Sequence, residues 1–320
     1  MARTDLLTVG EAFQDLIFVG LPHLPAGGEE VRTTRFVATI GGGAVITAAA
    51  AAGLGLRTAI VSGLSREAVR LLRRQKVRVV NLRRASEPHA VTAALSTARD
   101  RSFVTFNGVN DVLESRLPAA LARQHAAHVH FAFAPRRCSR WVRIVERLRA
   151  RGVTSSWDFG WSPELRTRAG FRRLLGAVDV VFVNGAEAVL YAGARRLATA
   201  DAYWRRSTRN TVIKLGARGS RWLAAGRDGV ERRDLSAPAP RVRAVDTTGA
   251  GDAFNGGFLA GWLTGRSPRE CLKLGNFVGA QSTTAPGGIA ALPNRPARLT
   301  RPAGPTRPIR PTRPTRPTRP

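Results

Sequence analysis

The sequence predicts an α/β fold with a mostly parallel central sheet and helices on both faces. The clearest sign is the near-continuous apolar run at 178–183, which is typical of a strand buried on both faces. A second sign is the alternation of such runs with helical segments from residue 128 onward, which favours parallel strands with helical crossovers. A length of 320 residues with 43% hydrophobic content allows one large domain or two smaller ones.

The first half of the chain supplies strands and one conspicuous helix. Residues 6–9 are an apolar strand, and the turn Gly41-Gly42-Gly43 opens an alanine-rich segment at 44–52. Alanine is the strongest helix former, so this segment is predicted to be a helix that Gly53 ends. The other elements expected here are strands at 58–62 and 77–82, a basic helix at 67–76, and a strand pair at 91–96 and 102–106.

The second half is expected to alternate regularly between strand and helix. Its apolar runs have the length of strands, and the segments between them have the length of crossover helices. The strands expected are 128–133, 153–157, 178–183 and 211–215, and the helices are 141–151, 171–175, 186–191, 251–263 and 268–284.

From Asn294 onward the composition changes to a Thr-Arg-Pro repeat. Proline at every third position excludes helix and sheet and favours an extended, disordered segment. We therefore expect a domain at 1–293 followed by a disordered tail at 294–320. Binding of the arginines to an acidic partner is the alternative to a simple solvated extension.

The formal net charge is +29, with 51 basic against 22 acidic residues. A field of this sign attracts polyanions, including ATP and nucleic acids. However, the only lysines are Lys76, Lys214 and Lys273, so arginine is over-used along the whole chain. We interpret the charge as compositional bias and expect no dedicated nucleic-acid partner.

Composition also bears on the compartment. The polar start of the chain leads directly into a strand, so we expect no signal peptide. The longest apolar run, 44–56, is too short and too rich in glycine to cross a membrane. Cys138 and Cys271 lie far apart and suggest neither a disulfide framework nor a metal site. A cytoplasmic protein without membrane contact is expected.

The strongest chemical motif is the string from Asp246 to Phe254, DTTGAGDAF. Its glycines precede an apolar helix, and the unpaired amides at such a helix start form an anion site. Asp252 falls in the first turn, where a carboxylate can accept the proton of an attacking hydroxyl. The alternative is an ordinary acidic residue at a helix N-terminus.

This string resembles the C-terminal signature of the ribokinase-like, or PfkB, family of carbohydrate kinases. Three further elements resemble that family in the same order: Gly41-Gly42-Gly43 before an alanine-rich helix, Asn184 with Glu187, and the segment from Lys214 to Gly219. Together the four elements cover about residues 5–293.

The resemblance implies a ribokinase-like three-layer fold with a small β lid at about 13–39 and 88–107. It implies transfer of the γ-phosphate of ATP to a hydroxyl of a small sugar or sugar-like substrate. Asp252 would be the catalytic base, and the amides of Gly249, Ala250 and Gly251 would hold the migrating phosphate. A homodimer through the lid is the expected assembly, and a monomer is the alternative.

Further roles follow from the resemblance alone. Asp15, Gly41 and Gly42 would bind the sugar. Asn184 and Glu187 would organise Mg²⁺, Glu187 through water, and Asp246 with Thr248 would hold a monovalent cation such as K⁺. The nucleotide would also contact Lys214, Gly216, Gly219 and Asn276. The alternatives are turn roles for Asp15, Asn184 and the glycines, and surface helix positions for Glu187 and Asn276.

The sequence departs from the family pattern at several positions. Ile46 stands where an Asn usually contacts the sugar, Lys214 stands where a Thr is usual, and the segment 62–66 is shortened. A non-catalytic protein that keeps the kinase fold and binds sugar or polyanion is therefore the alternative function. The sugar itself is not indicated, although Arg32, Arg35 and Arg99 in the lid offer a way to bind an anionic one.

Other nucleotide-binding and metal-binding classes lack support. The chain contains no Gly-x-x-x-x-Gly-Lys-Ser/Thr sequence and no protein-kinase catalytic loop. His128 and His130 alternate along one predicted strand, with His125 nearby. Core histidines are expected there rather than a metal cluster.

Overall fold

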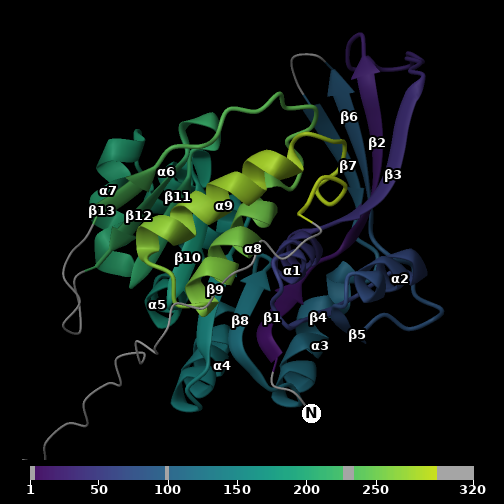
Figure 1. Ribbon diagram of the computed structural model, residues 1–320. Helices are drawn as coiled ribbons and strands as arrows, with labels where there is room; N and C mark the ends of the chain where they lie inside the picture. Colours follow the sequence, from purple (N-terminus) through teal and green to yellow (C-terminus); the bar gives the residue numbers. More distant parts are fainter. Residues whose placement is uncertain (1–3, 98–100, 226–233, 294–320) are drawn as a thin grey trace, which may run out of the picture.

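The computed structural model describes residues 4–97, 101–225 and 234–293 (Figure 1). A nine-stranded sheet forms its centre, and a separate four-stranded sheet stands at one end of the molecule. The expected tail at 294–320 and Arg99 lie outside the described residues.

The central sheet has the strand order β13-β12-β11-β10-β9-β8-β1-β4-β5. All neighbours from β11 to β5 are parallel, whereas β12 and β13 are antiparallel additions at one edge. The strands are β1 (Thr4–Gly10), β4 (Thr58–Ser62), β5 (Arg78–Asn81), β8 (Ala126–Ala132), β9 (Thr154–Asp158), β10 (Val180–Asn184), β11 (Asn210–Lys214), β12 (Ser220–Ala224) and β13 (Asp234–Ala237).

Helices cover both faces of this sheet, as β1 illustrates. Leu6 packs with the helices of one face, and Leu7 and Val9 pack with those of the other, because successive side chains of a strand point to opposite faces. One face carries α1 (Gly43–Gly53), α2 (Arg66–Arg74), α8 (Ala250–Leu263) and α9 (Pro268–Ser282). The other carries α3 (Asn110–Ala122), α4 (Cys138–Ala150), α5 (Phe171–Ala177), α6 (Gly185–Ala192) and α7 (Leu197–Ser207). The predicted three-layer α/β fold is confirmed.

The sequence-based prediction missed α3, α7, β12 and β13. In α3 the buried side chains Leu113, Leu117 and Leu121 recur at helical spacing, but Pro118 in the helix obscures the pattern. The antiparallel strands β12 and β13 are short and pair with the sheet edge, which a pattern of buried parallel strands does not reveal.

Close contact between α1 and α8 fixes the start of α8 beside the sheet. A Cβ at Gly256 would lie 2.6 Å from Ala50 Cβ and 2.8 Å from the carbonyl oxygen of Thr47. The Thr47 hydroxyl also donates to the carbonyl of Asp252 over 3.1 Å. The small residues of both helices therefore bring the first turn of α8 against α1.

Gly256→Ala should lower the free energy of unfolding by about 1–3 kcal/mol, because the added methyl group overpacks this helix crossing. Denaturant unfolding would measure the change. Gly27→Ala is the matched control, since a Cβ at Gly27 meets no atom within 4 Å. Equal stability of the wild type and Gly256→Ala would contradict a tight α1–α8 contact.

The four-stranded sheet has the order β3-β2-β6-β7 and consists of β2 (Phe13–Leu21), β3 (Arg35–Gly41), β6 (Val91–Thr97) and β7 (Arg101–Phe106). Asp15 and Ile17 lie on its buried face. The opposite face is apolar and carries Phe36, Val104 and Phe106, which are exposed. Among the described helices, none is long and apolar enough to cross a membrane.

Candidate active site

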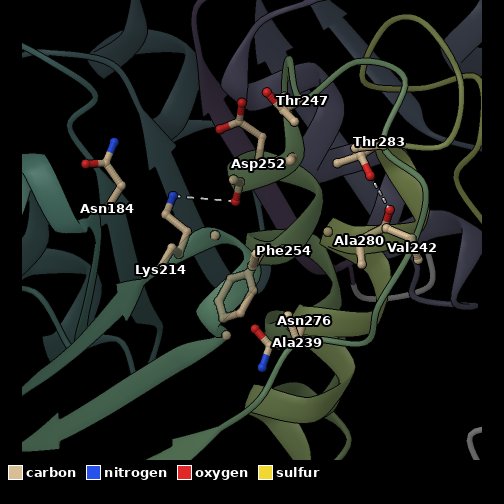
Figure 2. A pocket seen from close by; sticks show the side chains of 18 of the residues that line it. Asn184, Lys214, Ala239, Val242, Thr247, Asp252, Phe254, Asn276, Ala280 and Thr283 are labelled. Carbon is tan, nitrogen blue, oxygen red and sulfur yellow. Dashed lines mark hydrogen bonds between the residues drawn. The ribbon is translucent and has the colours of Figure 1, made fainter. Parts of the chain in front are cut away.

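The carboxyl ends of adjacent parallel strands meet at one edge of the central sheet. β9, β10 and β11 end at Asp158, Asn184 and Lys214, and these three residues line a cavity of about 800 Å³. Such a crevice is where open α/β sheets bind ligands. Figure 2 shows Asn184 and Lys214 on one side of the cavity, Asp252 and Thr247 at its end, and Val242 and Thr283 across from them.

The start of α8 forms the end of this cavity. Gly249 precedes the helix in the left-handed conformation with φ 72°. The amide of Ala250 donates to the Thr247 carbonyl over 3.3 Å, whereas the amides of Gly249 and Gly251 have no acceptor within the described part of the chain. Two amides at a helix N-terminus are thus available for an anion.

Asp252 is partly buried in the first turn of α8. Burial raises the pKa of its carboxyl to about 7, and the charges of Asp158 and Glu187 act in the same direction, while Lys214 opposes them. A carboxyl with a pKa near neutrality suits proton transfer at physiological pH.

A buried ion pair joins β9 to β11 directly beside Asp252. Lys214 Nζ lies 2.6 Å from Asp158 Oδ2 and 3.4 Å from Asn255 Oδ1. The Asn255 amide in turn donates to Asp158 Oδ2 over 2.7 Å. Burial lowers the pKa of Lys214, but the surrounding carboxylates outweigh this effect and raise it, so the ammonium is charged.

Asn184 and Glu187 form a capping box at the start of α6. Asn184 Oδ1 accepts from the Glu187 amide over 2.9 Å, and Glu187 Oε2 accepts from the Asn184 amide over 2.8 Å. Glu187 is buried, not an exposed helix acid, and burial raises its pKa to about 7. Both residues line the cavity.

The far half of the cavity is largely apolar. Gly216 and Gly219 both have positive φ in the turn between β11 and β12, and a Cβ at Gly219 would collide with the Ala237 carbonyl. The Asn276 side chain donates to the Ala237 and Pro238 carbonyls over 3.0 and 3.1 Å, which holds that segment against α9. The apolar lining consists of Ala239, Pro240, Val242, Phe254 and Ala280.

Asp15 reaches the other side of Asp252 from the four-stranded sheet. A Cβ on Gly41 would overlap the Asp15 carboxylate, so only glycine leaves room for it. Gly42 has φ 96°, and a Cβ there would lie 2.5 Å from the Glu11 carbonyl oxygen. At Gly43 a Cβ would lie 3.0 Å from Asp252 Oδ1. Burial raises the pKa of Asp15 to about 7, with a further contribution from Asp246.

Asp246 and Thr248 shape the loop before α8. Asp246 Oδ1 accepts from the Thr248 amide and hydroxyl over 2.9 and 2.7 Å, and Oδ2 accepts from the Gly287 amide over 2.9 Å. Ile46 packs against Gly249 and Gly288, so an apolar side chain stands beside the anion-binding loop.

Other residues singled out from the sequence lie elsewhere. Arg35 pairs with Val19 at the outer end of β3, six positions or about 20 Å of strand from Gly41, and Arg32 is exposed and paired with Glu30. His128 and His130 are buried and bonded to Ser156 Oγ, each over 2.8 Å. No group of three His, Cys, Asp or Glu side chains suited to a metal ion occurs among the described residues.

Comparison with known proteins shows to which protein family the chain belongs. The profile of the pfkB family carbohydrate kinases matches residues 3–295. The chain belongs to this family. A curated relative, acarbose 7(IV)-phosphotransferase of Actinoplanes sp., is 33% identical over 203 residues, which are 62% of this chain and 64% of the relative. The match to cytidine kinase of Thermococcus kodakarensis is also 33% identical and spans 48% of that protein. These matches span less than two thirds of either relative.

Solved structures share the fold along almost the whole length of this pfkB-family chain. Adenosine kinase from Sinorhizobium meliloti superposes with a TM-score of 0.73 at 24% identity and covers 91% of this chain and 98% of its own. Arabidopsis thaliana ribokinase complexed with ribose and ATP superposes with a TM-score of 0.71 at 22% identity and covers 92% and 97%.

Sequence reasoning gave no role to Asp158, to its partner Asn255, or to the lining residues Ala239, Pro240, Arg241, Val242 and Ala244. Asp158 directly follows the apolar run 153–157, so its place at the carboxyl end of a predicted parallel strand was a usable signal. Asn255 directly follows the signature string, but its bond to Asp158 arises only from the packing of α8 beside β9. The segment 239–244 carries no comparable signal, because it comes to the cavity only through its packing on α9.

Asp15→Asn should stabilise the protein more at pH 8 than at pH 5. A raised pKa means that the folded protein holds a proton that the unfolded chain releases, so this stability is fully present below the ordinary carboxyl pKa of 3.8 and is lost as pH rises from there through about 7. We expect a gain of about 1–3 kcal/mol at pH 8 from urea unfolding. Asp111→Asn, on the exposed side of α3, is the control. An equal effect at both pH values would exclude ionisation of Asp15 as the cause.

Proposed function

We propose that this chain is an ATP-dependent phosphotransferase that moves the γ-phosphate to a hydroxyl of a small sugar or sugar-like substrate. One observation carries the proposal: the partly buried Asp252 carboxyl lies in the same helical turn as the amides of Gly249 and Gly251, which have no acceptor among the residues that the structure describes. A base and an anion site in one turn are what in-line phosphoryl transfer requires. Membership in the pfkB family supports the same reaction.

In this mechanism the substrate hydroxyl attacks the γ-phosphorus while Asp252 accepts its proton. The bond between the γ-phosphorus and the bridging oxygen breaks, and ADP leaves with that oxygen. The amides of Gly249 and Gly251 donate to the phosphoryl oxygens as negative charge develops on them. Ala250 contributes less, because its amide already donates to Thr247.

The cavity suits ATP. Its volume of about 800 Å³ is within the range of small-molecule sites, and its apolar half offers Val242, Phe254 and Ala280 to an adenine ring. Gly216, Gly219 and Asn276 border that half, so we assign them to the nucleotide.

The same cavity suits a hydrated magnesium ion. Asn184 and Glu187 line it beside the phosphate end, and one Glu187 oxygen remains outside the capping box. Mg²⁺ favours carboxylates and retained water, and when bound it would neutralise phosphate charge. We assign Asp246 and Thr248 to K⁺ on the basis of the family resemblance.

The acceptor site favours a neutral polyhydroxylated substrate. Asp15, Gly41 and Gly42 lie next to Asp252, where a carboxylate can accept hydrogen bonds from hydroxyl groups. Arg32 and Arg35 lie toward the distant end of the four-stranded sheet, so they do not supply an anion site here. We propose that this sheet acts as a lid that excludes water from the acceptor.

Asp252→Asn should reduce kcat by about 10²–10⁴-fold, because the variant retains the shape of the site but loses the base. A coupled ADP-release assay with Mg²⁺ and K⁺, across sugars, sugar acids and nucleosides, would find the substrate and measure the loss. Asp111→Asn serves as the control for an aspartate outside the site. Unchanged turnover in Asp252→Asn would refute Asp252 as the base, and absence of turnover by folded wild type with every acceptor would favour a non-catalytic binding protein.

We also propose that the protein forms a homodimer through the lid, the four-stranded sheet β3-β2-β6-β7. Its outer face presents Phe36, Phe18 and Leu95 in one cross-strand row, with Val104 in the adjacent row on the same face. Phe36 and Val104 are 53% and 66% exposed. A second copy can cover such a face through a two-fold, self-complementary contact.

Val104→Asp should convert a dimer into a monomer, because it places a charge at an exposed position of the apolar face. Sedimentation velocity would measure the change in mass. Val112→Asp, at an exposed apolar position of α3, is the matched control and should leave the mass unchanged. A wild-type monomer at all concentrations would rule out the lid dimer.

A further inference from the structure

The largely buried lysine at the end of β11 has a further neighbour besides Asp158 and Asn255. Lys214 Nζ lies 3.5 Å from the Gly251 carbonyl oxygen, and a Cβ built on Gly251 would lie 3.1 Å from Nζ. The ammonium therefore touches the turn that offers free amides to an anion. Figure 2 shows its tip directed toward that turn, between Asn184 and Asp252.

The charges around this ammonium are mostly negative. The carboxylates of Asp158, Glu187 and Asp252 all act on it, and Asp15 and Asp246 lie beyond Asp252. A phosphate group entering the cavity would meet these carboxylates at close range. A fixed cation at the anion site offsets that repulsion, and in a water-poor site its effect is large.

The ammonium is held in place but retains donor capacity. Asp158 Oδ2 accepts from Nζ at 2.6 Å, and Asn255 fixes that carboxylate through its own amide. A lysine ammonium has three donors. Only the bond to Asp158 is short, whereas the contacts with Asn255 Oδ1 at 3.4 Å and the Gly251 carbonyl oxygen at 3.5 Å are long, so a phosphoryl oxygen can replace them as acceptor.

We propose that the Lys214 ammonium binds the phosphoryl group under transfer, and that Asp158 and Asn255 position it there. The proposal rests on the proposed phosphotransfer and adds a catalytic residue to it. Lys214 donates to a γ-phosphoryl oxygen on the side opposite to the acceptor, remains protonated throughout, and balances the charge that develops as the bond to ADP breaks. It thus takes part in the reaction with no proton transfer of its own.

The competing explanation is a purely structural ion pair that joins β9, β11 and α8. The two roles differ in what they do to nucleotides of different length. A phosphate contact affects ligands that carry the γ-phosphate, whereas loss of a structural pair affects stability and all nucleotides alike.

The test compares the affinities of AMP, ADP and the non-hydrolysable analogue AMP-PNP, with Mg²⁺, by titration calorimetry. Lys214→Met should weaken AMP-PNP binding by about 10–100-fold, the effect of losing one charge-assisted hydrogen bond, and should leave AMP binding unchanged. It should also lower kcat for the acceptor found in the activity screen. Lys273→Met, an exposed lysine on α9, is the matched control and should change none of these quantities.

Because Lys214→Met leaves Asp158 buried without its partner, the double variant Lys214→Met/Asp158→Asn provides a neutral version of the site. The same selective loss of AMP-PNP affinity is expected in it. Equal weakening of AMP and AMP-PNP, or no weakening of either, in the folded double variant would overturn the proposal. Asp252→Asn separates the hypotheses: if it abolishes turnover while the Lys214 variants bind AMP-PNP normally, the phosphotransfer stands and the role of Lys214 fails.

Discussion

The geometry of the whole site depends on the position of the first turn of α8. That turn faces the carboxyl edge of the sheet because Gly256 allows α8 to pack directly on Thr47 and Ala50 of α1. The left-handed Gly249 then turns the chain so that amide groups and Asp252 point into the same cavity. A larger side chain at either glycine would move the helix start away from the ends of β9, β10 and β11.

Several carboxyl groups lie close together around this turn, in a site that is partly shielded from water. Asp15, Glu187 and Asp252 all have pKa values raised to about 7 by burial. Their mutual repulsion is a cost to stability at neutral pH, and it places their titration where a proton-transfer site operates. Among these carboxyl groups Lys214, which is paired with Asp158, supplies a positive charge that offsets the repulsion.

The contacts of Ile46 and Lys214 explain what these two departures from the family pattern do in the structure. Ile46 packs on Gly249 and Gly288, so the position of the usual sugar-binding amide supports the loop instead. Lys214 replaces a neutral hydroxyl with a charged group that reaches the same turn. Asn184 combines the turn role considered from the sequence with a place in the site, since it caps α6 and lines the cavity. Glu187 completes the same cap but is buried, so the surface position considered for it does not apply.

The sequence by itself determined the α/β fold with helices on both faces, most of its buried strands as segments of the chain and the start of α8, because burial on both faces and glycine-dependent turns are local signals. It also placed Asp252 and Asn184 at element ends. Only the tertiary structure decided that Asp158 and Asn255 hold Lys214, and that Gly41 leaves room for Asp15. These contacts join residues from 26 positions apart, for Asp15 and Gly41, to 97 for Asp158 and Asn255, so they follow from how the helices and sheets pack and not from local pattern.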